Sequence, residues 1–91
     1  MNNILHIYSQ EIWHDSAHIV GTKDALIALR DAIDLALKEN KSMFESFTND
    51  GEGFPVIINL LDEKTLAKLS VPYIDEIAKE KNKNAIYPGQ F

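Results

Sequence analysis

The chain has 91 residues, 45% of them hydrophobic, no cysteine and a formal net charge of −5 at pH 7. That length is typical of one domain with a modest core, so we expect residues 1–91 to form a single domain that is stabilised by self-association. The lack of cysteine excludes disulfides, zinc–thiolate sites and cysteine nucleophiles. An acidic chain with one arginine is a poor binder of polymeric nucleic acid. The sequence shows no secretory leader and no apolar run of membrane-span length, so we expect a cytoplasmic protein with no membrane partner.

Two short strands are predicted in the N-terminal part of the chain, at 3–9 and 17–20. Apolar and polar residues alternate in the first strand, which places Leu5 and His6 on opposite faces. If the two strands pair, His6 and His18 could become cross-strand neighbours. We therefore expect an N-terminal hairpin that carries histidines on its polar face.

The clearest element in the sequence is a helix, predicted at 23–37. Thr22 is a good N-cap for it, and Asn40 is a plausible stop. Apolar residues recur at helical spacing and predict the face that packs against a sheet. This face comprises Leu26, Leu29, Ile33, Ala36 and Leu37, widened by Ala25 and Ala32.

The second half of the chain predicts a strand at 43–48, a turn at 49–53 and another strand at 54–61. The turn sequence, Asn-Asp-Gly-Glu-Gly, is a strong hairpin signal. The strand after it is apolar on both faces, which predicts a central strand covered from both sides. Short helices are expected to follow at 63–69 and 73–81.

The element order β-β-α-β-β-α predicts an α+β fold, a small and mainly antiparallel sheet with the first helix across one face. The other face needs a cover, either from the C-terminal segment or from another subunit. The tail at 85–91 is unusually apolar for a terminus. We expect it to dock on a partner subunit, in a homodimer or a larger assembly.

The stretch "IWHDSAHIVG" gathers two histidines, an aspartate and the only tryptophan within a few residues. On an extended chain His14 and His18 stand roughly 13 Å apart, too far to share one ion. We therefore predict no metal site. Two interpretations stay open: a cluster at the rim of the sheet anchored by Trp13, or contact of these side chains with a ligand.

The glycine-rich turn also has two interpretations. It lacks the further oxygen ligands of a calcium loop and the lysine of a phosphate-binding loop, so a plain hairpin turn is favoured. The alternative is that Gly51 and Gly53 let the backbone beside Asp50 approach a ligand closely.

Arg30 lies at the edge of the apolar face of the helix. It is predicted to form a surface pair with Asp34, one turn further on. Its alternative role is a bidentate grip on a phosphate or carboxylate. Aromatic residues such as Tyr73 could likewise be core or stack on a ligand ring. The full set of candidate ligand contacts is Trp13, His14, His18, Arg30, Asp50, Gly51, Gly53 and Tyr73.

Known catalytic patterns are missing from the sequence. It has no nucleophile elbow, no acidic pair with a histidine at a recognisable spacing and no cofactor fingerprint. We therefore predict no catalytic residue and no cofactor.

The motifs "WHDSAHIVGTKDALIALRDAI", "DGEGF" and "VPYIDEIA" resemble those of a family of small α+β proteins of bacteria and their phages. The family has no settled activity, so the resemblance transfers no catalytic residue. In size, acidity and layout the chain is also similar to immunity proteins that neutralise toxins and to phage "sponges" that sequester nucleotide signals of host defence.

These observations favour a non-enzymatic protein of phage or mobile-element origin that captures a small nucleotide-derived signal. One alternative is an immunity protein or host-enzyme inhibitor that binds a protein target through the acidic side chains of the helix. Others are a small nucleotide hydrolase with His14 or His18 as base, and a structural subunit of a phage particle.

Overall fold

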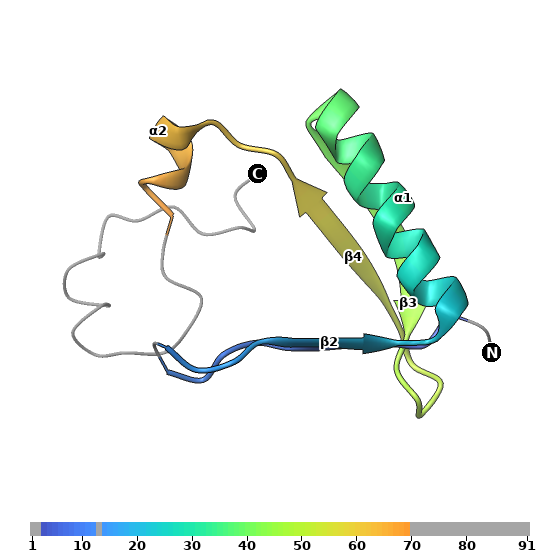
Figure 1. Cartoon of the computed structure of the whole chain (residues 1–91). Helices are drawn as coiled ribbons and strands as arrows, with labels where there is room; N and C mark the ends of the chain where they lie inside the picture. Colours follow the sequence, from blue (N-terminus) through green and yellow to red (C-terminus); the bar gives the residue numbers. More distant parts are fainter. Residues whose placement is uncertain (1–2, 13, 70–91) are drawn as a thin grey trace. The chain divides into compact units, whose positions relative to one another are not determined.

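The computed structural model describes residues 3–12 and 14–69. These residues form a small α+β structure with two antiparallel two-stranded sheets and one long helix (Figure 1). The expectations for Trp13, for Tyr73 and the helix at 73–81, and for the tail at 85–91 lie outside the described residues.

The described chain falls into two compact units. The first comprises residues 3–8 and 18–60, and the second comprises residues 9–12, 14–17 and 61–69. The first unit contains β1 (Leu5–Tyr8), β2 (His18–Gly21), α1 (Lys23–Glu39), β3 (Lys41–Phe47) and β4 (Gly53–Asn59), and the second contains α2 (Glu63–Leu66). The sequence predicted this order of elements, with a longer final helix at 63–69; whether 1–91 is one domain stays a prediction.

The second unit holds one short helix and a loop. Asp62 caps α2 by accepting a hydrogen bond from the backbone N–H of Thr65 at 2.7 Å. In the loop, the Asp15 carboxylate accepts from the backbone N–H of Ser16 at 2.9 Å and from that of Glu11 at 3.3 Å. These bonds hold the loop through its own polar groups.

The N-terminal hairpin forms with a register different from the predicted one. β1 and β2 pair antiparallel, with His6 opposite Val20 and Tyr8 opposite His18. The expected His6–His18 cross-strand pair is therefore wrong by two residues. The register begins with Leu5 opposite Gly21, the residue before the helix N-cap Thr22, and this places Val20 opposite His6.

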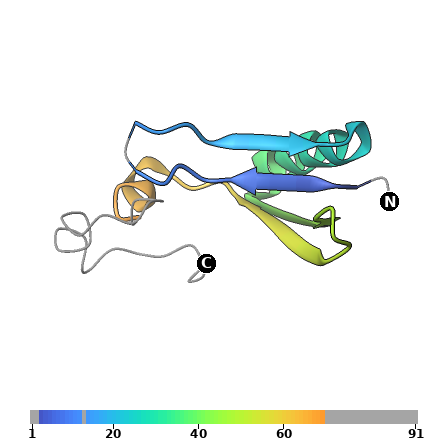
Figure 2. The same ribbon diagram turned by 90° about the horizontal axis from the view of Figure 1, so that it is seen from below.

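A single sheet was expected, but the two hairpins stay separate and run in different directions (Figure 2). They meet at one parallel bridge between Ile4 and Phe47. There the Asn3 carbonyl accepts the Phe47 N–H at 2.9 Å and the Ser46 hydroxyl at 2.5 Å. The backbone pairing between β1 and the second hairpin does not extend beyond this bridge. The N–H of Asn49 donates to the His6 side chain of β1 and not to a backbone carbonyl.

The predicted caps of α1 are confirmed. The Ala25 N–H donates to the Thr22 hydroxyl oxygen at 3.3 Å, and Asn40 ends the helix in the left-handed conformation with φ of 72°. Its Lys41 neighbour begins β3 directly. Local signals therefore fixed both ends of this helix.

Part of the predicted apolar face of α1 packs against β3 and β4. Its buried residues are Ala25, Ala32 and Ala36, with Leu29 partly buried beside them. Ser42 of β3 donates its hydroxyl to the Ala32 carbonyl at 2.5 Å, so small residues on both elements allow a close approach. The large residues of the predicted face lie turned outward, with Leu26 42%, Ile33 43% and Leu37 62% exposed.

β4 is covered on one face only within the described chain. Val56 is 7% exposed and faces α1, whereas Ile57 is 50% exposed on the other face. Met43, its partner on β3, is 66% exposed. The prediction of a central strand covered from both sides is therefore wrong for these residues.

The small core of the first unit lies where the helix meets both hairpins. It consists of Leu5, Ala25 and Val56, with Leu29, Phe44 and Phe54 packed against it. Among the described residues, no helix has the length and apolar character needed to cross a membrane.

Candidate functional site

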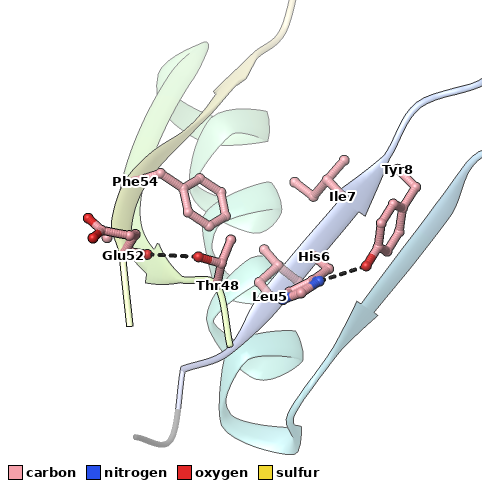
Figure 3. Close-up of a pocket in the computed structure, with 8 residues that line it drawn as sticks. Leu5, His6, Ile7, Tyr8, Thr48, Glu52 and Phe54 are labelled. Atoms are coloured by element: carbon pink, nitrogen blue, oxygen red, sulfur yellow. Dashed lines mark hydrogen bonds between the residues drawn. The ribbon is translucent and has the colours of Figure 1, made fainter. Parts of the chain in front are cut away.

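A cavity of about 340 Å³ lies between β1 and the start of β4 (Figure 3). It belongs wholly to the first unit. The residues that line it are Leu5, His6, Ile7, Tyr8, Thr48, Glu52, Gly53 and Phe54. Its volume is near the lower end of the range for small-molecule sites, about 300–1,000 Å³.

The walls of the cavity are mainly apolar. Phe54 of β4 and Ile7 of β1 point toward one another across the space, and Leu5 lies below them (Figure 3). Leu5 is fully buried, whereas Ile7 is 51% exposed. This arrangement exists because the hairpins diverge after their single bridge, so no strand of the second hairpin pairs with the edge of β1 that faces away from β2.

A chain of hydrogen bonds orders the polar side of the cavity. The backbone N–H of Asn49 donates to Nε2 of His6 at 3.0 Å, and Nδ1 of His6 lies 2.7 Å from the Tyr8 hydroxyl. A ring nitrogen that accepts has no proton, so the proton of the neutral imidazole is on Nδ1. Nδ1–H therefore donates to the Tyr8 oxygen, and the Tyr8 hydroxyl keeps its own hydrogen for another acceptor.

A second cavity, of about 320 Å³, shares His6 and Tyr8 with the first. Its other lining residues are Ile4, Val20, Gly21, Thr22 and Asn49. The His6–Tyr8 pair thus forms a partition between two small hollows of the same unit. Its rings stand 5.7 Å apart and are inclined at 53°.

The β3–β4 turn borders the first cavity and is held by its own polar groups. Thr48 donates its backbone N–H to the Glu52 carbonyl at 2.9 Å, and its hydroxyl donates to the Asp50 carboxylate. The Thr48 hydroxyl and then the backbone N–H of Glu52 hold the pKa of Asp50 below its ordinary value of 3.8. Gly51 takes a φ of 91°, which glycine adopts without strain.

This turn gives a prediction for pH. The carboxylate of Asp50 has a lower pKa in the folded state, so its stabilising effect is present above the ordinary value of 3.8 and is lost as the pH falls through the folded pKa. Thr48→Val removes the main donor, and we expect the carboxyl titration midpoint of Asp50, followed by NMR, to rise toward 3.8. Thr48→Ser keeps the hydroxyl and serves as the control. An unchanged midpoint in Thr48→Val would contradict this account.

The structure brings few of the predicted ligand contacts to the cavities. Gly53 lines the first cavity, and His18 lies opposite Tyr8, which lines both. Asp50 and Gly51 form the adjacent turn, outside both linings. His14 lies in the loop of the second unit, with φ of 64°.

Arg30 is on the exposed surface of α1 and lines neither cavity. Its guanidinium lies 3.1 Å from the carboxylate of Asp31, and the two side chains are 67% and 62% exposed. The predicted pairing with Asp34 is therefore wrong; the ion pair is with the next residue instead. An exposed pair of this kind stabilises by at most about 1 kcal/mol.

The polar residues that order the site, His6 and Tyr8, were absent from the predicted contacts. Their alternation with Leu5 and Ile7 was visible in the sequence and placed them on one face of the strand. No local pattern pointed to the bond from Asn49, which is 43 positions away. The hydrogen bond from Asn49 to His6 distinguishes this polar face of β1 from a strand face that contacts only solvent.

The described residues contain no group of three or more histidine, aspartate or glutamate side chains that could hold a metal ion. No family model, curated protein or solved structure matches the chain. The resemblance to small proteins of bacteria and their phages therefore stays a hypothesis that rests on the quoted motifs.

Proposed function

We propose that this chain is a non-enzymatic binding protein that captures a small nucleotide-derived molecule, in the manner of an anti-defence sponge. The observation that supports the proposal is the cavity between β1 and β4, with its aromatic and aliphatic walls and a few ordered polar groups. Phe54 offers an apolar ring surface to a base, and the Tyr8 hydroxyl offers a hydrogen bond.

The arrangement suits binding better than turnover. Both ring nitrogens of His6 are engaged, Nε2 by the Asn49 N–H and Nδ1 by Tyr8, so the imidazole has no lone pair left to accept a proton from a substrate. A general base in this cavity would have to break the bond that orders it. This supports capture over hydrolysis with His6 as base; the alternative of a nucleotide hydrolase with His14 or His18 as base is a separate hypothesis.

Ile7 and Ile19 offer a matched test of the proposal. They are directly opposite each other on β1 and β2 and are similarly exposed, at 51% and 56%, but only Ile7 lines the cavity. We expect Ile7→Ala to weaken ligand binding about fivefold, since removing three carbons from a half-exposed side chain that lines the cavity costs roughly 1 kcal/mol of contact with the ligand, while Ile19→Ala leaves binding unchanged.

The measurement is isothermal titration with a panel of nucleosides, cyclic nucleotides and cyclic ADP-ribose isomers. Native mass spectrometry of the freshly purified protein adds the subunit count and any small molecule that co-purifies. If no member of the panel binds and nothing co-purifies, the proposal is wrong. Equal losses in Ile7→Ala and Ile19→Ala would move the site away from this cavity.

A second candidate function is binding to another protein, including a second copy of this chain. It is favoured by the outward row of Leu26, Ile33 and Leu37 on α1, which are large apolar side chains at helical spacing. Asp34, beside this row on the helix surface, is exposed and carries negative charge. The subunit count from native mass spectrometry addresses the self-association that both candidates allow.

A further inference from the structure

The edge of β1 that faces away from β2 carries backbone groups that belong to no ladder. Thr22 is opposite Ile4 when the register of the hairpin is continued by one residue, and its N–H donates to the Ile4 carbonyl at 2.9 Å. Hydrogen-bonded and non-hydrogen-bonded pairs alternate along an antiparallel ladder, so the pair Ile7–Ile19 is a non-hydrogen-bonded one. The N–H and C=O of Ile7 therefore point away from β2.

This edge of β1 is on the side of the second hairpin. The Asn3 carbonyl, which points away from β2 by the same alternation, accepts the N–H of Phe47 at 2.9 Å. No strand of the described residues pairs with β1 on this side beyond that contact. The N–H and C=O of Ile7 thus have no backbone partner within the described part of the chain.

The first cavity runs along this open edge. Consecutive residues of a strand point to opposite faces, and a hollow on one face is lined by alternate residues. All of Leu5–Tyr8 line the cavity, which indicates a position at the edge of the strand, with Ile7 on the wall opposite Phe54 (Figure 3). Leu5 is fully buried and Ile7 is 51% exposed, so Ile7 is the residue of this edge that a ligand can reach.

One donor and one acceptor on the same residue match the edge of a nucleobase. Adenine and cytosine have an amino group beside a ring nitrogen, and guanine and uracil have a ring N–H beside a carbonyl, so each base has a donor and an acceptor on adjacent atoms. Hydrogen bonds at a strand edge run perpendicular to the strand, within the sheet. A base held there lies roughly in the plane of the hairpin and presents its faces to apolar side chains such as those of Ile7 and Phe54.

We infer that the backbone N–H and C=O of Ile7 hold the base of the captured molecule by two hydrogen bonds, one donated and one accepted. This inference rests on the proposed function and specifies what the cavity recognises: a planar ring with a donor and an acceptor on adjacent atoms. An extended peptide would need a ladder of such pairs. Within β1 only Ile7 offers an accessible pair, because Leu5 is buried and the strand ends at Tyr8.

Amide hydrogen exchange of the isotope-labelled full chain, followed by NMR, tests the pair directly. Ile19 is the matched control, because it is opposite Ile7 and its N–H points to the other edge of the hairpin. The probe is the tightest binder among adenosine, guanosine, cytidine and uridine, chosen by isothermal titration. With about nine-tenths of the sites occupied, we expect exchange at Ile7 to slow about tenfold, because this N–H then exchanges only from the free protein, and exchange at Ile19 to stay unchanged.

Proline variants test the same hydrogen bond by affinity. Ile7→Pro removes the N–H and keeps three side-chain carbons, whereas Ile7→Ala keeps the N–H and one carbon; proline is tolerated where a strand N–H is outside the ladder. We expect Ile7→Pro to bind the nucleoside at least about fivefold more weakly than Ile7→Ala, whereas Ile19→Pro and Ile19→Ala bind it as the parent does.

Purine riboside tests the ligand side of the pair. It has the ring system of adenosine but no hydrogen-bond donor on the ring. We expect the parent chain to bind it at least about fivefold more weakly than the tightest of the four nucleosides. This comparison and the exchange measurement use the parent chain, so they decide the matter if circular dichroism shows that Ile7→Pro does not fold.

The outcomes separate this inference from the function on which it rests. Slower exchange at Ile7 alone, with a larger loss of affinity in Ile7→Pro than in Ile7→Ala, supports it. A nucleoside that binds without slowing exchange at Ile7, or purine riboside that binds as tightly, overturns it and leaves capture of a nucleotide-derived molecule standing. If the four nucleosides do not bind and another molecule of the panel for the proposed function does, the inference alone is wrong. If nothing binds, both are wrong.

Discussion

Leu5→Ala is expected to lower the free energy of unfolding by about 2–5 kcal/mol. Leu5 is fully buried at the point where the first hairpin, α1 and the second hairpin meet, in a core with Ala25 and Val56 against which Leu29, Phe44 and Phe54 pack. Replacing its isobutyl group by a methyl group removes this buried contact and leaves a cavity at the centre of a small core. The free energy of unfolding of such a domain is about 5–15 kcal/mol, so this substitution removes a large part of its stability.

Urea unfolding followed by circular dichroism measures this effect. Ile7→Ala is the matched control, because Ile7 lies two residues further along β1 but is 51% exposed. We expect it to cost less than about 1.5 kcal/mol. Leu5→Val, which keeps most of the side chain, provides a folded variant if Leu5→Ala does not fold. Similar midpoints for the variants at positions 5 and 7 would show that the core does not lie where the structure puts it.

The features of this fold that could be predicted from the sequence are those set by neighbouring residues. Thr22 and Asn40 cap the helix because a hydroxyl oxygen and a left-handed residue act on the backbone beside them. The turn around Gly51 forms because glycine accepts the φ of 91° found there. Each of these signals lies within a few residues of its effect.

The features that could not be predicted depend on which elements meet. Apolar spacing predicted a wide face of α1 that included the alanines as well as larger residues such as Leu26 and Ile33. The structure buries the alanines of this face and leaves the larger residues exposed, because Ser42 of β3 donates to the Ala32 carbonyl and the two backbones lie close together there. A helix with both small and large apolar rows is ambiguous until its partner is known.

The candidate site depends on the same kind of long-range contact. Gly53 was selected for its flexibility and does line the cavity, whereas the histidine that orders the site was placed only on a polar face. What gives His6 its role is the Asn49 N–H, donated from a turn 43 positions away. Two hairpins that had merged into one sheet, as predicted, would have paired that N–H with a carbonyl and left no cavity.

Gly21→Ala is expected to lower the free energy of unfolding by about 1–3 kcal/mol. Gly21 has no positive φ to favour glycine, so an alanine there would ordinarily stabilise the chain by about 0.4–1 kcal/mol through the unfolded state. Sterics reverse the sign, because an added Cβ would lie 2.9 Å from the Ile4 carbonyl oxygen and 3.0 Å from Cδ1 of Leu5. Backbone and core cannot both move aside.

Gly53→Ala is the control that separates crowding by backbone from crowding by a mobile side chain. Its added Cβ would lie 2.8 Å from the Glu45 carboxylate oxygen, which can swing into solvent, and 3.1 Å from Cε1 of Phe47. We therefore expect it to change the free energy of unfolding by less than about 1 kcal/mol, measured by urea unfolding beside Gly21→Ala. A Gly21→Ala protein as stable as the parent would mean that β1 is not held against β2 and α1 by the Ile4–Thr22 contact, in which the Thr22 N–H donates to the Ile4 carbonyl at 2.9 Å. Without that contact the cavity would also lose its fixed wall, because the residues of β1 that line the cavity, Leu5–Tyr8, come directly after Ile4 in the chain.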